Sequence, residues 1–162
     1  MKAPGKVFTL DDEDYENESS FSHWTISSSL SDHKLVYRLN QVLGSNFKRS
    51  KSDHVSHLKG HHFEHVTYTW YDSFEDIQWC ILMNRGRTRS EENHGEVLHR
   101  NILASKPPVD YIVVAMDEID SEQANNMLTA IRKTQGVTYA TALEPSVSQR
   151  AELNIELENI LL

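Results

Sequence analysis

The stretch "VDYIVVAM" (Val109–Met116) is the most apolar run in the chain, and it decides how the surrounding sequence is interpreted. Its β-branched content is typical of a central β-strand. A helical pattern follows it and begins at Asp120 or Ser121, with Gln123 in position to complete a capping box. The buried face of this helix is predicted to contain Ala124, Met127, Leu128 and Ile131.

The helical pattern ends at Gly136, and "VTYATAL" (137–143) then alternates as another strand. Residues 110–143 therefore form a strand–helix–strand unit of the kind found in ferredoxin-like domains. That comparison concerns the fold and does not establish a function.

The same strand-to-helix change occurs earlier in the chain. "FSHWTISSS" (21–29) alternates as a strand, and a helix is predicted over 32–43 because Ser31 is a good N-cap and Gly44 a good C-terminal residue. Apolar residues recur at helical spacing on this helix, with Val36 at the edge of the stripe: Leu35, Leu39, Val42 and Leu43.

An antiparallel hairpin is predicted from residues 64–71 and 76–84, on either side of the turn "YDSFED". Its buried face is predicted to hold Val66, Tyr68, Trp70, Ile77, Trp79, Ile81 and Met83. The histidine-rich segment before His62 has no apolar pattern and is predicted to be a solvated loop, and residues 85–97 a flexible loop. Short strands are expected near 46–50 and before Pro107.

These elements predict an α+β fold with a largely antiparallel sheet and two helices on one face. We divide the chain into an extended acidic segment over 1–20, a single α+β domain over 21–146 and a C-terminal amphipathic helix over 147–162. The acidic segment contains "DDEDYENE", a like-charge block that is typically solvated. The terminal helix is predicted from the spacing of its apolar residues, which are Leu153, Leu157, Ile160 and Leu161.

Composition restricts the classes of function. Acidic residues outnumber basic ones 24 to 16, which gives a net charge of −8 and makes general binding to nucleic acid backbones unfavourable. The one cysteine, Cys80, excludes an internal disulfide and a cysteine-based zinc site. No secretory signal or membrane-spanning run is expected, so we predict a cytoplasmic protein without membrane contact.

Three segments together resemble a known family: "ISSSLSDHKLVYRLNQVLGSNFKR", "NILASKPPVDYIVV" and "IRKTQGVTYATAL". They are similar to the IPExxxVDY proteins, small bacterial proteins of the Bacteroidota. Val109, Asp110 and Tyr111 match the second half of that signature, whereas Leu103, Ala104 and Ser105 stand where the IPE triplet would be. The family has no assigned function, so the resemblance supports the fold and carries over no site residue.

The stretch "SDHVSHLKGHHFEH" (52–65) holds five of the nine histidines in the chain. Neutral imidazole is a good ligand for zinc, nickel or copper, so the candidate metal ligands are His54, His57, His61, His62 and Glu64. The spacing matches no established metal motif, and the zinc-protease pattern HExxH is absent. A solvated loop is the simpler interpretation.

Two further features have both structural and functional interpretations. Asp110 begins the most apolar strand, where it either caps the preceding turn, pairs with an arginine or serves a function. Basic residues gather at 48–51 and 85–89 around the aromatic residues of the hairpin, a pattern found in RNA-binding sheets. Core packing is the simpler role for those aromatic residues.

The sequence contains no phosphate-binding glycine loop, nucleophile elbow or paired-carboxylate motif. We therefore predict a non-enzymatic module without a cofactor that binds a protein or a small ligand. The alternatives are a metal-binding or metal-sensing protein that uses the histidines and an RNA-associated factor. The apolar tail and the sheet edges also predict a homodimer.

Overall fold

The computed structural model describes residues 21–89, 95–104, 108–117 and 119–143. The acidic segment over 1–20 and the C-terminal helix predicted over 147–162 lie outside the described residues. The described part contains two helices, α1 (Asp32–Leu43) and α2 (Ser121–Lys133). Its strands are β1 (Ser22–Ser28), β2 (Lys48–Arg49), β3 (His54–Leu58), β4 (His61–His65), β5 (Thr67–Asp72), β6 (Ile77–Met83), β7 (Arg85–Arg87), β8 (His99–Asn101), β9 (Tyr111–Ala115) and β10 (Val137–Ala142).

The main sheet has six strands in the order β10-β1-β9-β6-β5-β2, and all its neighbouring strands are antiparallel. All five residues of β9 are buried, which confirms that the apolar run at 109–116 supplies a central strand. Along the chain, β9–α2–β10 is a continuous strand–helix–strand unit, whereas β2 to β5 are inserted between α1 and β6. The strands β1 and β6 alternate with β10 and β9 in the sheet. The predicted α+β fold with a largely antiparallel sheet is confirmed.

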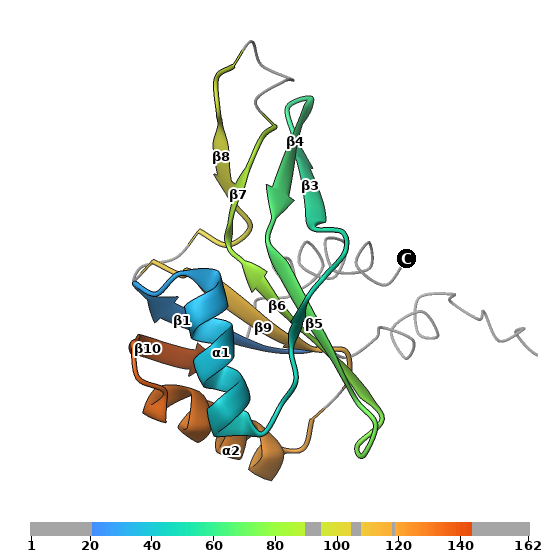
Figure 1. Cartoon of the computed structure of the whole chain (residues 1–162), viewed down its shortest axis with the longest axis vertical. Helices are drawn as coiled ribbons and strands as arrows, with labels where there is room; N and C mark the ends of the chain where they lie inside the picture. The colour runs from blue at the N-terminus through green and yellow to red at the C-terminus, as the bar shows by residue number, and fades with distance from the viewer. Residues whose placement is uncertain (1–20, 90–94, 105–107, 118, 144–162) are drawn as a thin grey trace, which may run out of the picture.

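Both helices cover one face of the main sheet (Figure 1). Leu35 and Leu39 of α1 and Ile131 of α2 are fully buried in the same core as the sheet residues Trp24, Ile26, Trp79, Ile81, Tyr111, Val113 and Ala140. Gly44 ends α1 in the left-handed conformation at φ 64°, and the Asp120 carboxylate caps α2 by accepting a hydrogen bond of 2.8 Å from the Gln123 amide. The predicted cap positions Ser31, Gly44 and Asp120 are therefore confirmed, although the Ser31 side chain forms no cap hydrogen bond. The predicted end of the second helix at Gly136 is wrong, because α2 ends at Lys133 with Thr134 as its C-cap.

The opposite face of the sheet is also buried. Cys80, Leu82, Ile112 and Val114 are fully buried there, and Ile102, Leu103 and Val109 pack against them. The central strands consequently have no polar face, which explains the nearly continuous apolar sequences of β6 and β9.

The remaining strands form a second sheet in the order β3-β4-β7-β8, which extends as an arm from the main body (Figure 1). The prediction of a loop before His62 is wrong, because this segment supplies β3 and the start of β4. The flexible loop predicted over 85–97 is wrong at 85–87, which form β7, and residues 90–94 lie outside the described residues. Lys59 and Gly60 explain part of the difference, since their positive φ values of 51° and 79° form the tight turn that joins two antiparallel strands.

Both strands of the predicted hairpin are interrupted where they pass from the main sheet into the arm. The strand predicted over 64–71 divides at Val66, and its partner divides at Asn84. The buried Asn84 side chain holds the chain here by donating hydrogen bonds to the Leu103 and Val109 carbonyls and accepting one from the Leu103 amide. Alternation continues through such an interruption, so the sequence does not mark it.

Candidate functional site

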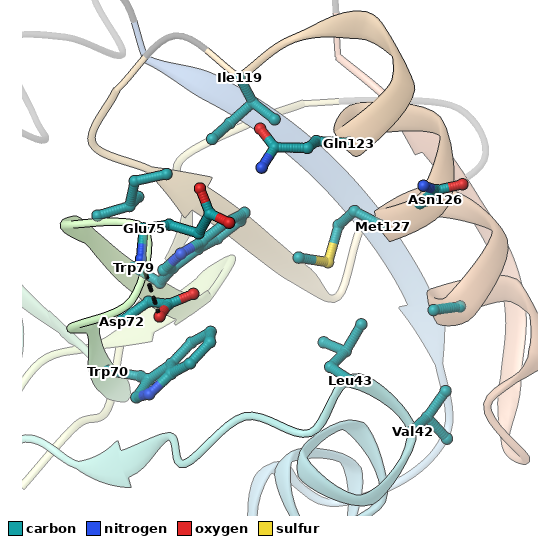
Figure 2. Close-up of a pocket in the computed structure, with 12 residues that line it drawn as sticks. Val42, Leu43, Trp70, Asp72, Glu75, Trp79, Ile119, Gln123, Asn126 and Met127 are labelled. Atoms are coloured by element: carbon teal, nitrogen blue, oxygen red, sulfur yellow. Dashed lines mark hydrogen bonds between the residues drawn. The ribbon is translucent and has the colours of Figure 1, made fainter.

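A cavity of about 310 Å³ lies on the helix-covered side, where the β5–β6 hairpin meets the two helices (Figure 2). This volume is at the lower end of the range of about 300–1,000 Å³ that is usual for small-molecule sites. The cavity is lined by Val42, Leu43, Trp70, Asp72, Glu75, Ile77, Trp79, Ile119, Gln123, Asn126, Met127 and Ala130.

The sheet side of the cavity is aromatic. Trp70 and Trp79 are directly opposite each other on β5 and β6, with their ring centroids 6.3 Å apart and their planes at 23°. Trp79 is buried and also stacks on Trp24, whereas Trp70 is only partly buried and contacts Phe47. The cavity therefore adjoins a row of aromatic rings that contains all three tryptophans of the chain.

The helix side of the cavity combines apolar side chains with the polar Gln123 and Asn126 of α2. Leu43 of α1 and Met127 of α2 point toward the hairpin, and Val42 lies beside them at 45% exposure (Figure 2). The sequence placed Val42 in the buried stripe of its helix and Val36 at the edge, whereas Val36 is buried at 3% exposure. Val42 therefore lines the cavity with an exposed side chain.

Two carboxylates come from the hairpin turn. Asp72 shares a face of β5 with Trp70, and Glu75 follows in the turn; both lie on the cavity side of the hairpin in Figure 2. The Asp72 carboxylate also orders the turn by accepting a hydrogen bond of 3.0 Å from the Phe74 amide. No lysine, arginine or histidine is among the lining residues that the structure describes, so the site is apolar with a negative rim.

The candidate metal ligands are divided between the two faces of the β3–β4 hairpin. By alternation and register, His54 and His61 lie on one face, and His57, His62 and Glu64 lie on the other. The His57 and His62 rings contact each other with centroids 4.5 Å apart, while Glu64 forms an ion pair with Arg89. No group of three or more His, Cys, Asp or Glu residues suited to a metal ion occurs in the described part of the chain.

His65 has a structural environment. It is fully buried, with Nε2 at 2.8 Å from the Ser56 hydroxyl and Nδ1 at 3.0 Å from the Met83 carbonyl. Because a carbonyl only accepts, Nδ1 carries a proton, and in the neutral form of the ring Nε2 accepts from the Ser56 hydroxyl. The ring lies against Gly86, where an added Cβ would be 2.5 Å from it.

Asp110 holds the end of the main sheet. Its side chain is exposed, and one carboxylate oxygen accepts a hydrogen bond of 2.8 Å from the Ser28 amide of β1. Asp110 lines neither this cavity nor the second one described below. Cys80 is fully buried, and burial raises the pKa of its thiol to about 12, which does not suit a nucleophile.

The basic clusters do not surround an exposed aromatic surface. Arg49 is held by Asp53 through two hydrogen bonds, and Arg89 is held by Glu64. Tyr68 and Trp79 belong to the helix-covered core. Arg85 and Arg87 line a second cavity of about 430 Å³, whose other lining residues are Asp32, Glu64, Val66, Met83 and His99. The lining of this second cavity contains both acidic and basic side chains.

The sequence predicted the core positions of Trp70 and Trp79 but not the cavity beside them. The lining residues Asp72 and Glu75 belong to "YDSFED", which the sequence predicts only as a turn. Three acidic residues in this turn, directly after Trp70, are the signal of a negative site beside an aromatic ring. None of the helices in the described ranges combines the length and apolar character that a membrane crossing requires.

Comparison with known proteins adds no relative: no family model, curated protein or solved structure matches the chain.

Proposed function

We propose that this protein is a non-enzymatic cytosolic module that binds a small ligand in the cavity between α1, α2 and the β5–β6 hairpin. The observation that carries the proposal is the incomplete closure of the core at this point. Trp70, Leu43 and Met127 are each only partly buried around a cavity of about 310 Å³. Apolar side chains that adjoin a formed cavity are the usual basis of small-ligand affinity.

The lining supports binding more than catalysis. Its titratable groups in the described residues are two carboxylates on one hairpin turn, and the single thiol of the chain lies on the opposite face of the sheet. The strand order β10-β1-β9-β6 beneath two helices further supports a ferredoxin-like core into which β2 to β5 are inserted. The "VDY" that leads into β9 is consistent with membership of the IPExxxVDY family.

A fragment screen followed by nuclear magnetic resonance tests the proposal. The three tryptophan side chains give three indole N–H signals, and two of these residues line the cavity. We expect apolar fragments to shift the Trp70 and Trp79 signals and the Met127 methyl signal. Replacing Met127 with tryptophan, which fills the cavity from the helix side, should abolish these shifts while the fold is retained.

The matched control is Leu58→Trp, which adds the same side chain at a position of 45% exposure on the arm. It should leave fragment binding unchanged. A library whose hits shift signals of the arm and leave those of the cavity residues in place would contradict the proposed function.

A further inference from the structure

We propose that the ligand of this cavity is an organic cation with an apolar body, such as an alkylated ammonium group. The inference rests on the proposed function and adds the chemical class of the ligand. It follows from three features of one site: the indole rings on the sheet side, the carboxylates at the hairpin turn and the absence of any basic residue among its described lining residues.

The indole rings provide the first feature. The face of an aromatic ring carries negative electrostatic potential, and tryptophan attracts cations more strongly than phenylalanine or tyrosine does. Trp79 is buried and stacks on both Trp24 and Trp70, so the indole open to a ligand is that of the partly buried Trp70. A neutral apolar ligand would gain contact with this ring, whereas a cation would gain contact and electrostatic attraction.

The carboxylates provide the second feature. Asp72 and Glu75 line the cavity, and neither forms an ion pair with a basic side chain in the described structure. Asp72 is held in place by the Phe74 amide, so one of the charges is fixed relative to the indoles. An anionic ligand would meet two negative charges here without a compensating cation among the described lining residues, which makes the binding of an anion unfavourable.

The apolar lining determines the body of the ligand. Leu43, Ile77 and Met127 offer no hydrogen bond to a strongly hydrated ammonium or metal ion. An alkylated ammonium is weakly hydrated and covers its charge with methyl or methylene groups, so it fits both the rim and the interior. The net charge of −8 would in addition favour the approach of a cation over that of an anion.

The test compares choline with 3,3-dimethylbutan-1-ol, a neutral molecule of the same shape in which carbon replaces nitrogen. Each is titrated into the full chain, and the Trp70 and Trp79 indole signals are followed. We expect choline to bind at least tenfold more tightly than the alcohol. Added salt should weaken the binding of choline and leave that of the alcohol unchanged.

Variants identify the groups responsible. Glu75→Gln should weaken choline binding severalfold without affecting the alcohol, whereas Glu122→Gln is the control because it removes one charge from the exposed side of α2. Trp70→Leu should weaken choline binding more than Trp70→Phe does. Asp72→Asn retains an oxygen for the Phe74 amide and should resemble Glu75→Gln.

The outcomes separate the two proposals. Equal affinity for choline and the alcohol would overturn the cationic ligand and support a cavity that binds small molecules. If choline does not bind at millimolar concentrations, the cationic ligand is likewise overturned, and the fragment screen alone decides the proposed function.

Discussion

At the scale of single residues, His65 and two tyrosines have side chains whose buried environments lead to testable effects on stability. His65 uses both ring nitrogens and lies against the backbone of Gly86, so the β4–β7 contact depends on the absence of a side chain at that glycine. Burial acts on the tyrosines: it raises the pKa of Tyr68 to about 12, with a further contribution from its hydrogen bond to Asp32, and it raises the pKa of Tyr111 to about 12.

Gly86→Ala should destabilise the protein. The added Cβ would be 2.5 Å from the His65 ring, and overpacking of this kind typically costs about 1–3 kcal/mol. Urea unfolding measures the change. The cost should be smaller when His65 is already alanine, because the clash is then absent. An equal cost in both backgrounds would show that the contact is not the cause.

The free energy of unfolding should fall as the pH rises from 10 to about 12. Tyr68 and Tyr111 ionise near pH 10.0 when the chain is unfolded but near pH 12 in the fold, so their contribution is complete below pH 10 and is lost above it. Tyr68→Phe should reduce the alkaline loss measured by urea unfolding. Tyr37→Phe is the control because Tyr37 is 65% exposed, and an equal reduction there would contradict the assignment.

At the scale of elements, hydrophobic periodicity predicted the helices and strands that pack on the main core. It did not predict the strands of the arm, which extends away from that core. The bounds of α1 and the strand at 111–115 followed from caps and from apolar content, because each element packs on one continuous core. The arm was missed because β3 and β4 are rich in histidine and are held by a tight turn and by polar contacts such as His65 to Ser56. The cavity was not predicted because the apolar pattern of a helix does not show whether each apolar side chain is packed against the sheet. Val42, in the last turn of α1, fits the pattern but lines the cavity.

Val113→Asp should prevent soluble folding. Val113 is 1% exposed in the centre of the helix-covered core, and an unpaired carboxylate there costs on the order of several kcal/mol. Val97→Asp is the control because Val97 is 44% exposed. Soluble yield and melting temperature measure both variants, and a soluble Val113→Asp protein with an unchanged melting temperature would contradict the position of β9.

His57→Gln and His62→Gln together should change the free energy of unfolding by less than about 0.5 kcal/mol, because both side chains are exposed. His54 is left unchanged in this variant because it is buried. Urea unfolding and elemental analysis test the prediction. Stoichiometric zinc or nickel that is bound by the original chain and lost by this variant would favour a metal-binding function.

At the scale of the whole molecule, β10 and β2 form the two edges of the main sheet. Strand edges with unpaired backbone groups favour pairing with another chain, so a homodimer remains our prediction. Light scattering at high micromolar concentration should give twice the mass of the chain. Deleting residues 149–162 tests whether the tail contributes, since a folded monomer would then result. A monomeric mass for the full chain would contradict the dimer.

The central claim at this scale is that the cavity between the two helices and the β5–β6 hairpin holds an organic cation. The most direct measurement is the set of intermolecular nuclear Overhauser effects between the N-methyl protons of choline and the protein. The account predicts effects to the Trp70 ring and to the Met127 methyl group. Effects confined to side chains outside the cavity, such as those of the β3–β4 arm, would contradict it.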